Sequence, residues 1–522
     1  MIDSLCVQRQ CRRVSVWSRQ IERERAAPVY SAHLAAERTS DVRHKIRLEG
    51  FVTPEDARGQ YVYVPFDVPA GARRLEVSYF YENQVQGAQE FNPGNNIDIG
   101  VFDVRGAEFL RGGFRGWSGG ARSSFHITPD AATPGYLRGP IQQGQWNIIF
   151  GLSKISDERV RYRLNVDLEI DPASTSEDES GEVPLPGSSR AGEAQTVGGG
   201  SNGAGRWYRG DLHAHSEHSD GMNTVEEIVT FVRDAGLDYF ALTDHNTISH
   251  WDELARLNDP AGTLLIAGEE ITMYGGHANV WGIDGWIDFR GSDDDRVRAL
   301  IDDAHARGSM FSVNHPDSPI PWLHEQVRGY GALEIWNAPW RYYNEPALLR
   351  WEGHLLKGER IVAVGGSDSH CIPPAPMTQP NLPGEPCTWV YVEGGLTQRG
   401  VLDAVQAGRV FISESPMGPY IDMRVTAAGR EALPGDVLDV PEGTPLQVRV
   451  RYRGPDGKKL RFFGREGLYI EFVADREEYD TQFDLRAEGD GFVRCEVRGY
   501  RGRPDRGEVV HALTNAVYFG KW

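Results

Sequence analysis

Residues 210–221 read GDLHAHSEHSDG and place three histidines and two aspartates within twelve positions. Side chains on a β-strand repeat every two residues, so a strand here would point His213 and His215 to the same side. A metal site and a solvated surface loop would both accommodate such a run. The choice between them depends on whether other strands of the chain end in matching ligands.

From Trp207 onward, short apolar runs alternate with helical patterns. The segment TVEEIVTFVRDAG (224–236) has the apolar spacing of a helix and begins with a capping box formed by Thr224 and Glu227. Buried strands are expected in DYFALTDHN, TLLIAGEEIT, MFSVNHP, ALEIWN and RIVAVGGSDSH. Repeated β–α units of this length predict a parallel sheet, either a barrel or a doubly wound sheet.

The predicted strands end in residues that can bind metals. These residues are His213, His215 and Asp220, then Asp244 and His245, then Glu269, Glu270 and His277, then His315, and finally Asp368 and His370. In a barrel of this kind, the carboxyl ends of the strands form the face on which loops converge and chemistry is done. Imidazole and carboxylate ligands together suit Zn²⁺, Mn²⁺ or Fe²⁺. A set of unrelated surface residues would have to explain each strand end separately, so we predict a metal site.

The flanking segments are predicted to be β-rich. Residues 46–170 alternate aromatic and β-branched residues with polar ones, as in YVYVPFDV and RYRLNVDLEI, which predicts an antiparallel β-sandwich. Residues 171–206 are rich in Ser, Gly, Glu and Pro and are expected to be a flexible linker. Residues 1–45 are expected to be a disordered or marginally helical leader. The β/α region then covers 207–420, and a small β-domain covers 421–522.

Composition excludes several classes of protein. The formal net charge of −20 argues against nucleic-acid and anionic-membrane partners, and there is no basic stripe with interleaved aromatic residues. The five cysteines show no CxxC spacing, so neither a disulfide framework nor a zinc ribbon is expected. No apolar run approaches the roughly 20 residues needed to span a bilayer. With no signal-peptide pattern at the start, the expected location is the cytoplasm.

The motifs DLHAHSEHSDG, LTDHNT, GEEI, GHANVWG, NHP and GGSDSH resemble those of the polymerase and histidinol phosphatase (PHP) superfamily of metallohydrolases. The order GHANVWG, NHP, EIWN, GGSDSH and the final TNAVYF resemble most its CehA/McbA group, the carbaryl-hydrolase-like enzymes. The resemblance implies a distorted (β/α)7 barrel between two β-domains, with two or three divalent ions.

By the same resemblance, His213, His215, Glu270 and Asp368 hold a first metal. Glu270 bridges to a second metal, held also by His277 and His315, while Asp220, His245 and His370 hold a third. Glu269 is an alternative bridge.

The predicted activity is hydrolysis of a small-molecule phosphoester by a hydroxide that bridges the metals, with Asp368, His370, His245 and Glu270 as catalytic ligands. Hydrolysis of an aryl ester or carbamate is the alternative, as is a non-catalytic binding protein with a structural metal site. A nuclease is disfavoured by the charge.

Other residues receive lesser roles. Trp336, Asn337 and Arg341 are candidates to line the substrate pocket, the arginine by pairing with an anion. Asp244 is expected to orient neighbouring groups. His218 and His250 are expected to be a solvated residue and a loop residue, and no triad context supports Ser367 as a nucleophile. The sandwich either contacts carbohydrate through exposed aromatics such as Trp117 or covers the barrel.

Overall fold

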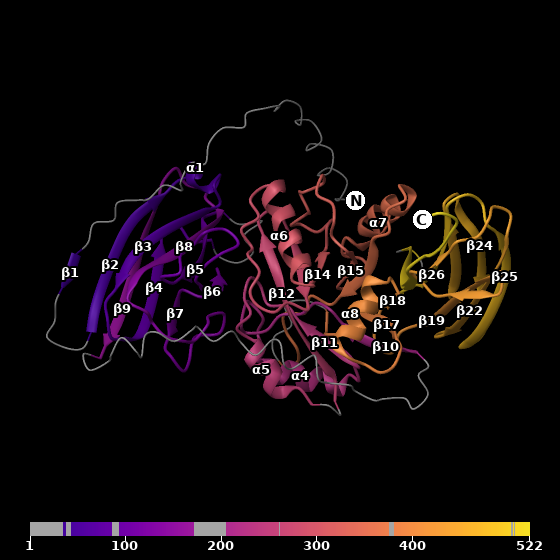
Figure 1. The fold of residues 1–522 in the computed structure, drawn as a ribbon, viewed down its shortest axis with the longest axis horizontal. Helices are drawn as coiled ribbons and strands as arrows, with labels where there is room; N and C mark the ends of the chain where they lie inside the picture. Colours follow the sequence, from indigo (N-terminus) through magenta and orange to yellow (C-terminus); the bar gives the residue numbers. More distant parts are fainter. Residues whose placement is uncertain are drawn as a thin grey trace.

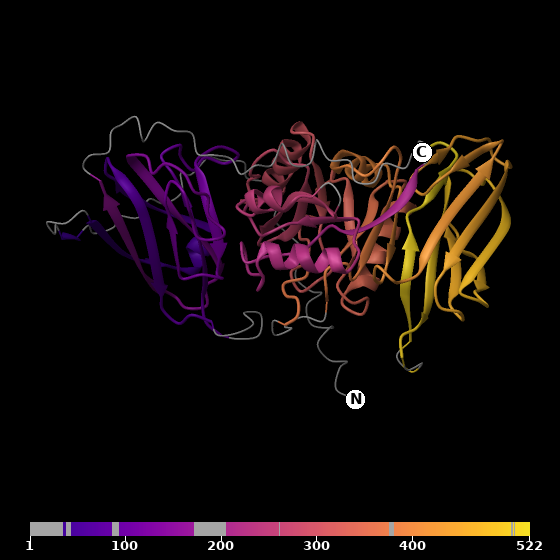
Figure 2. The same ribbon diagram turned by 90° about the horizontal axis from the view of Figure 1, so that it is seen from below.

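The computed structural model describes residues 43–85, 93–171, 205–259, 262–374, 381–502, 505 and 507–522, and the backbone of residues 35–37. Three β-rich regions lie in a row along the molecule in the order of the sequence (Figures 1 and 2). Most of the predicted leader and most of the predicted linker fall outside the described residues.

The N-terminal region is made of two antiparallel sheets packed face to face, with strand orders β1–β2–β9–β4–β7 and β3–β8–β5–β6. Inward-facing apolar side chains of both sheets form one core, in which Leu75, Ile99, Ile148 and Leu164 are fully buried. The strands are β1 Ala35–Glu37, β2 Arg43–Val52, β3 Tyr61–Val68, β4 Ala72–Tyr81, β5 Asn96–Phe102, β6 Phe114–Gly119, β7 Ser124–Ile127, β8 Gly144–Lys154 and β9 Val160–Ile170, with the one-turn helix α1 Pro54–Ala57.

The leader prediction is wrong at its end, because β2 begins at residue 43 and β1 precedes it. The start of β2 is charged and therefore lacks the apolar alternation by which a strand is detected. Arg43 instead faces Glu169 on β9 at 3.0 Å, and Lys45 faces Asp167 at 3.6 Å. Backbone pairing with β9 extends the strand where the side chains give no apolar signal.

The middle region is built from seven consecutive strands with helices between them. They are β10 Arg206–Asp211, β11 Tyr239–Leu242, β12 Leu264–Met273, β13 Gly276–Trp281, β14 Met310–Val313, β15 Ala332–Asn337 and β16 Val362–Gly366; the helices are α4 Val225–Asp234, α5 Trp251–Leu257, α6 Asp294–Ala306 and α7 Asn344–Leu356. Neighbours are parallel except for β13, which is antiparallel to both β12 and β14. The sequence reading missed this antiparallel strand.

The first and last strands of this series meet just beyond their carboxyl ends. Ala214 and Ser369 form a parallel backbone bridge, and the Asp368 amide donates to the His213 carbonyl oxygen at 2.9 Å. The segments that follow β10 and β16 are thereby brought side by side, so that residues about 155 positions apart in the sequence share one site.

Helix α4 shows how local sequence builds this region. Thr224 accepts a hydrogen bond from the Glu227 amide, and the Glu227 side chain accepts from the Thr224 amide, which confirms the predicted capping box. The predicted apolar face is fully buried against the sheet, and it consists of Val225, Ile228, Val229 and Val232. Burying a side chain of this size contributes about 1.5–3 kcal/mol, so the face fixes the helix to the sheet.

Part of the C-terminal region continues the same sheet, and the rest includes a separate four-stranded sheet. From β10 the order runs β17–β18–β27–β26–β23–β24. These elements and the remaining ones are β17 Cys387–Val392, α8 Gln398–Gln406, β18 Val410–Ser413, β19 Tyr420–Ala427, β20 Arg430–Ala432, β21 Val437–Leu438, β22 Pro445–Arg453, β23 Lys459–Gly464, β24 Gly467–Val473, β25 Glu478–Arg486, β26 Gly491–Tyr500, β27 Glu508–Thr514 and β28 Val517–Phe519. Strand β27 covers the edge of β18 that would otherwise be open, so the predicted boundary at 420–421 does not interrupt the sheet.

The sandwich packs on the middle region through aromatic side chains. Phe114 stacks on Trp286 with ring centroids 4.2 Å apart, and Trp117 lies 4.7 Å from Phe289. Trp117 is only 5% exposed, so it serves the core of this contact and does not offer a surface for carbohydrate. Within the described part of the chain, no helix is both long enough and apolar enough to cross a membrane.

Candidate metal centre

All nine residues predicted as metal ligands lie at one end of the middle sheet. The structure sorts them into four overlapping groups, in each of which the ligand atoms lie within 4.8 Å of one another. The groups are His215–Asp220–His245–His370, His213–His215–Glu270, His213–His315–Asp368 and His245–Glu270–His277. The tertiary structure therefore gathers side chains that are spread over almost 160 positions of the sequence.

Glu270 lies at the centre of these groups. Its Oε1 is 3.3 Å from His213 Nε2 and 3.4 Å from His315 Nε2, and its Oε2 is 2.7 Å from His245 Nδ1 and 3.4 Å from His215 Nε2. Glu270 thus lies within 3.4 Å of imidazoles from all four groups, a central position from which one carboxylate can be shared between ions. Asn314 donates to Oε1 at 2.9 Å and fixes the orientation of the carboxylate.

The alternative bridge, Glu269, points elsewhere. Its Oε2 accepts a hydrogen bond from the Ile287 amide at 3.0 Å, and it belongs to none of the four groups. Burial raises the pKa of Glu269 well above its ordinary value, which favours a neutral carboxyl group. Glu269 is therefore not placed to bridge two ions.

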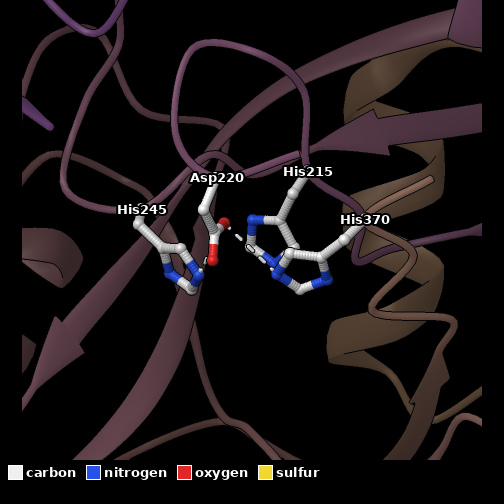
Figure 3. A group of neighbouring side chains, drawn as sticks. All are labelled: His215, Asp220, His245 and His370. Atoms are coloured by element: carbon white, nitrogen blue, oxygen red, sulfur yellow. Dashed lines mark ion pairs between the residues drawn. The ribbon is translucent and has the colours of Figure 1, made fainter. Parts of the chain in front are cut away.

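A second group surrounds Asp220, as Figure 3 shows. Its Oδ1 lies 3.2 Å from His370 Nε2 and 3.4 Å from His245 Nε2. Burial opposes protonation of both histidines, but the Asp220 carboxylate outweighs it and raises the pKa of His370 to about 10 and that of His245 to about 9. In the absence of a metal, protons on these rings balance the charge of the carboxylates.

The donor atoms fit divalent cations. His213 Nε2 and His215 Nε2 are 3.1 Å apart, and Asp368 Oδ1 is 3.0 Å from the latter. His215 Nδ1 is buried without a hydrogen-bond partner. Burial, followed by the charges of His245 and His370, lowers the pKa of His215 to about 4, which leaves its ring neutral as metal binding requires.

The carboxylates are also ready to bind cations. Burial alone would favour the neutral acids, yet the charge of His213 and its neighbours holds the pKa of Glu270 and of Asp368 well below the ordinary range. In the described part of the chain, the ion pairs of Asp220, Glu270 and Asp368 are all with histidines. Among the described residues, no lysine or arginine therefore pairs with the oxygens that a metal would use.

The sequence reading missed Glu334. This residue of β15 is 2% exposed, and its Oε1 lies 2.9 Å from His213 Nδ1. The available signal was its place in the segment ALEIWN, near the carboxyl end of a strand next to those that carry ligands.

The three predicted substrate contacts fall in different places. Asn337 lies in the centre and donates to Asp368 Oδ2 at 3.3 Å. Trp336 is buried and packs against Trp340 with centroids 4.7 Å apart, so it serves the core. Arg341 is exposed and donates to the Arg501 carbonyl oxygen at 3.1 Å, so the structure does not bring its guanidinium into the ligand groups.

The prediction that His218 is solvated is wrong, because this side chain is buried. His250 lies in the turn before α5, as expected of a loop residue, but it is also buried. His218 contacts Ser249 Oγ at 2.7 Å and Glu253 Oε1 at 3.3 Å, whereas His250 precedes helix α5 and lies 3.1 Å from Asp244 Oδ2. The partners of His218 lie more than 30 positions away in the sequence, whereas Asp244 precedes His250 by six positions.

Asp244 and Ser367 support the loops that carry ligands. Asp244 accepts hydrogen bonds from Ser216 and Ser219, on the loop between His215 and Asp220. The hydroxyl of Ser367 donates to the His213 carbonyl oxygen at 3.1 Å, which is a structural bond and not a nucleophile's environment.

The chain is similar to a curated protein and to two solved structures. A phosphoribosyl 1,2-cyclic phosphate 1,2-diphosphodiesterase from Eggerthella lenta is 31% identical over 64 residues, which are 12% of this chain and 24% of that protein. The chain thus matches only about a quarter of the length of this relative.

The first solved structure is a two-domain protein from Bacteroides vulgatus, described as containing a predicted PHP-like metal-dependent phosphoesterase. It has 18% identity and a TM-score of 0.33, and the match covers 62% of this chain and 98% of that one. The second, a candidate metal-dependent phosphoesterase from Bifidobacterium adolescentis, has 17% identity and a TM-score of 0.26, with 37% and 94% covered. Both TM-scores are too low for a common fold to follow from them.

The segment that matches a known protein family contains most of the candidate ligands. Residues 211–316 match the PHP domain, and this segment holds seven of the nine candidate ligands, from His213 to His315. This segment of the chain is therefore similar to the PHP domain.

Proposed function

We propose that this protein is a metal-dependent hydrolase of phosphoesters that works with two or three divalent ions. The observation that carries the proposal is the position of Glu270, whose two oxygens face different sets of histidines within overlapping ligand groups. A structural metal site is closed by four ligands, whereas nine ligands in overlapping groups suit a multinuclear catalytic centre. We further propose that β10–β16 are the distorted (β/α)7 barrel of the CehA/McbA group.

The residues of the chain have distinct roles in this proposal. His213, His215 and Asp368 would hold one ion together with Glu270, and Glu270 would be shared with an ion held by His277 and His315. Asp220, His245 and His370 would hold a third. When bound, such ions act as Lewis acids and lower the pKa of bound water toward neutrality.

The comparisons favour a phosphoester over other substrates. The curated relative is named as a phosphodiesterase, and its likeness to this chain over 64 residues supports the same bond type here. The negative charge of three carboxylates in one centre repels an anionic substrate. Bound divalent ions make the net charge of the centre positive, so that phosphate oxygens are attracted. Mn²⁺, Zn²⁺ and Fe²⁺ all suit this mixture of imidazole and carboxylate ligands.

The test is turnover by protein reloaded with Mn²⁺ or Zn²⁺ on a chromogenic panel of aryl phosphomonoesters, phosphodiesters, acyl esters and N-methylcarbamates. We expect turnover of phosphoesters, lowered more than about 100-fold in Asp368→Ala because a ligand of the Lewis acid is lost. The control is Asp480→Ala, which removes a half-exposed carboxylate on β25 and is expected to retain full activity.

Turnover confined to acyl esters or carbamates would overturn the phosphoester proposal and favour the carbaryl-hydrolase type. Full metal content with no turnover of any substrate class would favour a binding protein with a structural metal site. Unchanged metal content and activity in Asp368→Ala would contradict the assignment of the centre itself.

A further inference from the structure

Glu334 connects candidate ligands that come from three other strands. Its Oε1 lies 2.9 Å from His213 Nδ1, and its Oε2 accepts from the His315 amide and from Asn337 Nδ2, each at 3.0 Å. The same Asn337 nitrogen lies 3.3 Å from Asp368 Oδ2. One buried carboxylate on β15 is therefore linked to ligands that follow β10, β14 and, through Asn337, β16.

The bond to His213 determines which ring nitrogen can bind a metal. A carboxylate only accepts hydrogen bonds, so Nδ1 must carry the proton in this contact. The lone pair of Nε2 is then free, and this atom faces Glu270, His215 and Asp368 at 3.1–3.4 Å. Carboxylate partners of this type fix the ring orientation and raise the basicity of metal-binding histidines.

The bonds to His315 and Asp368 restrain an unusual backbone. The φ angles of His315 and Asp368 are +27° and +52°, in the left-handed region that residues other than glycine rarely adopt. Such conformations persist only where surrounding contacts hold them. At His315 the contact is the amide hydrogen bond to Glu334, and at Asp368 it is the pair of bonds from Asn337 and to the His213 carbonyl oxygen.

We propose that Glu334 is a positioning residue that preorganises three metal ligands at once, namely His213, His315 and Asp368. The proposal rests on the metal site of the proposed function and adds to it a residue outside the nine ligands. Glu334 sets the tautomer of the first ligand and the backbone of the second, and through Asn337 it directs the carboxylate of the third. Without it, the ligands would have to be ordered by the metal itself, at a cost in affinity.

The test measures Mn²⁺ affinity by calorimetry, and Co²⁺ coordination by absorption spectroscopy, on the full chain. We expect Glu334→Ala to lower Mn²⁺ affinity by about 10–100-fold, the range found for partners of metal-binding histidines. Glu334→Gln should fall between this variant and the parent, because the amide oxygen can still accept from His213 while its NH₂ group meets the donors of His315 and Asn337. The Co²⁺ spectrum should change in both variants, since it reports ligand geometry.

The matched control is Glu496→Gln on β26. This glutamate is also buried, at 1% exposure, but pairs with Arg494 and Arg498 away from the ligand groups. It should lose stability while keeping the Mn²⁺ affinity and the Co²⁺ spectrum of the parent. A general effect of removing a buried charge is thereby separated from a specific effect on the site.

The outcomes are distinguishable. If the parent protein binds Mn²⁺ and both Glu334 variants bind it equally well with an unchanged Co²⁺ spectrum, the positioning role is wrong and the metal site stands. An equal loss of affinity in Glu496→Gln would also overturn the role, because destabilisation alone would then explain it. If the parent binds neither metal, the proposed function itself fails.

Discussion

Asp98, on β5 of the sandwich, carries a carboxyl group whose surroundings oppose ionisation. It is 8% exposed, its Oδ2 accepts from the Tyr274 hydroxyl at 2.6 Å, and its Oδ1 accepts from Asn96 at 3.2 Å. Burial raises its pKa to about 6, although both hydrogen bonds and the charge of His245 act in the opposite direction. Tyr274 lies between β12 and β13, so its hydrogen bond to Asp98 joins the sandwich to the segment that carries ligands.

The raised pKa of Asp98 predicts a pH-dependent loss of stability. Below about pH 4 the Asp98 carboxyl group is protonated in both the folded and the unfolded protein. Between pH 4 and 6 it ionises only in the unfolded protein, so the free energy of unfolding falls as pH rises. Above pH 6 the loss is complete and amounts to about 2–3 kcal/mol. Asp98→Asn should abolish this decrease in the free energy of unfolding. Urea unfolding of the metal-free parent and variant at pH 4, 5, 6 and 8 would measure the difference in stability between them. A stability difference that is the same at all four pH values would contradict the assignment.

Elements of this fold differ in how much room they leave for a side chain. Gly366 ends β16, and a Cβ built on it would lie 2.4 Å from both Glu334 Oε1 and His213 Cβ. Gly353, inside α7, has no atom within 4 Å of such a Cβ. Neither glycine has a positive φ, so sterics alone separate the two.

Alanine substitution should therefore act in opposite directions at these glycines. Gly353→Ala should raise the free energy of unfolding by about 0.5–1 kcal/mol, because alanine restricts the unfolded chain and favours a helix. Gly366→Ala should push Glu334 away from His213 and lower Mn²⁺ affinity together with stability. Unfolding curves and calorimetric titration check both, and an unchanged Mn²⁺ affinity in Gly366→Ala would show that β16 adjusts without disturbing the centre.

At the scale of the whole molecule, a buried ion pair fastens the sandwich to the middle region. Asp288 and Arg290 lie 2.5 Å apart with almost no exposure. Arg290 also donates to the Tyr63 hydroxyl at 2.6 Å and to the Ala107 carbonyl oxygen at 2.7 Å, both in the sandwich. The Leu110 amide donates to Asp288 at 2.9 Å. The two regions therefore share polar as well as aromatic contacts.

Removing one member of this pair should cost more than removing both. Arg290→Ala leaves Asp288 buried without its cation and should lower the free energy of unfolding by about 3–5 kcal/mol. The double variant Asp288→Leu, Arg290→Met should recover part of this loss, because no uncompensated charge is left buried. Differential scanning calorimetry checks the order of the three proteins. If the double variant were less stable than Arg290→Ala, the hydrogen bond from the Leu110 amide to Asp288 would outweigh the cost of the unpaired buried charge.

The amino-acid sequence by itself determined the elements whose signals are local. The period-2 runs of the sandwich, the apolar face of α4 with its Thr224 capping box, and the ligand types at the strand ends could all be read from neighbouring residues. So could the choice of histidine and carboxylate ligands, since their chemistry is carried by each side chain separately. These features depend on contacts within a few positions of the chain, where spacing alone specifies geometry.

Only the tertiary structure decided which of these residues work together. The continuation of the sheet into the C-terminal strands and the burial of His218 and Trp117 depend on partners distant in the sequence. The exclusion of Glu269 and the link from Glu334 to His213 likewise follow from where β12, β15 and β10 meet. Long-range contacts leave no periodic trace in the chain, because they arise from the packing of whole elements, and so they had to be observed in the folded molecule.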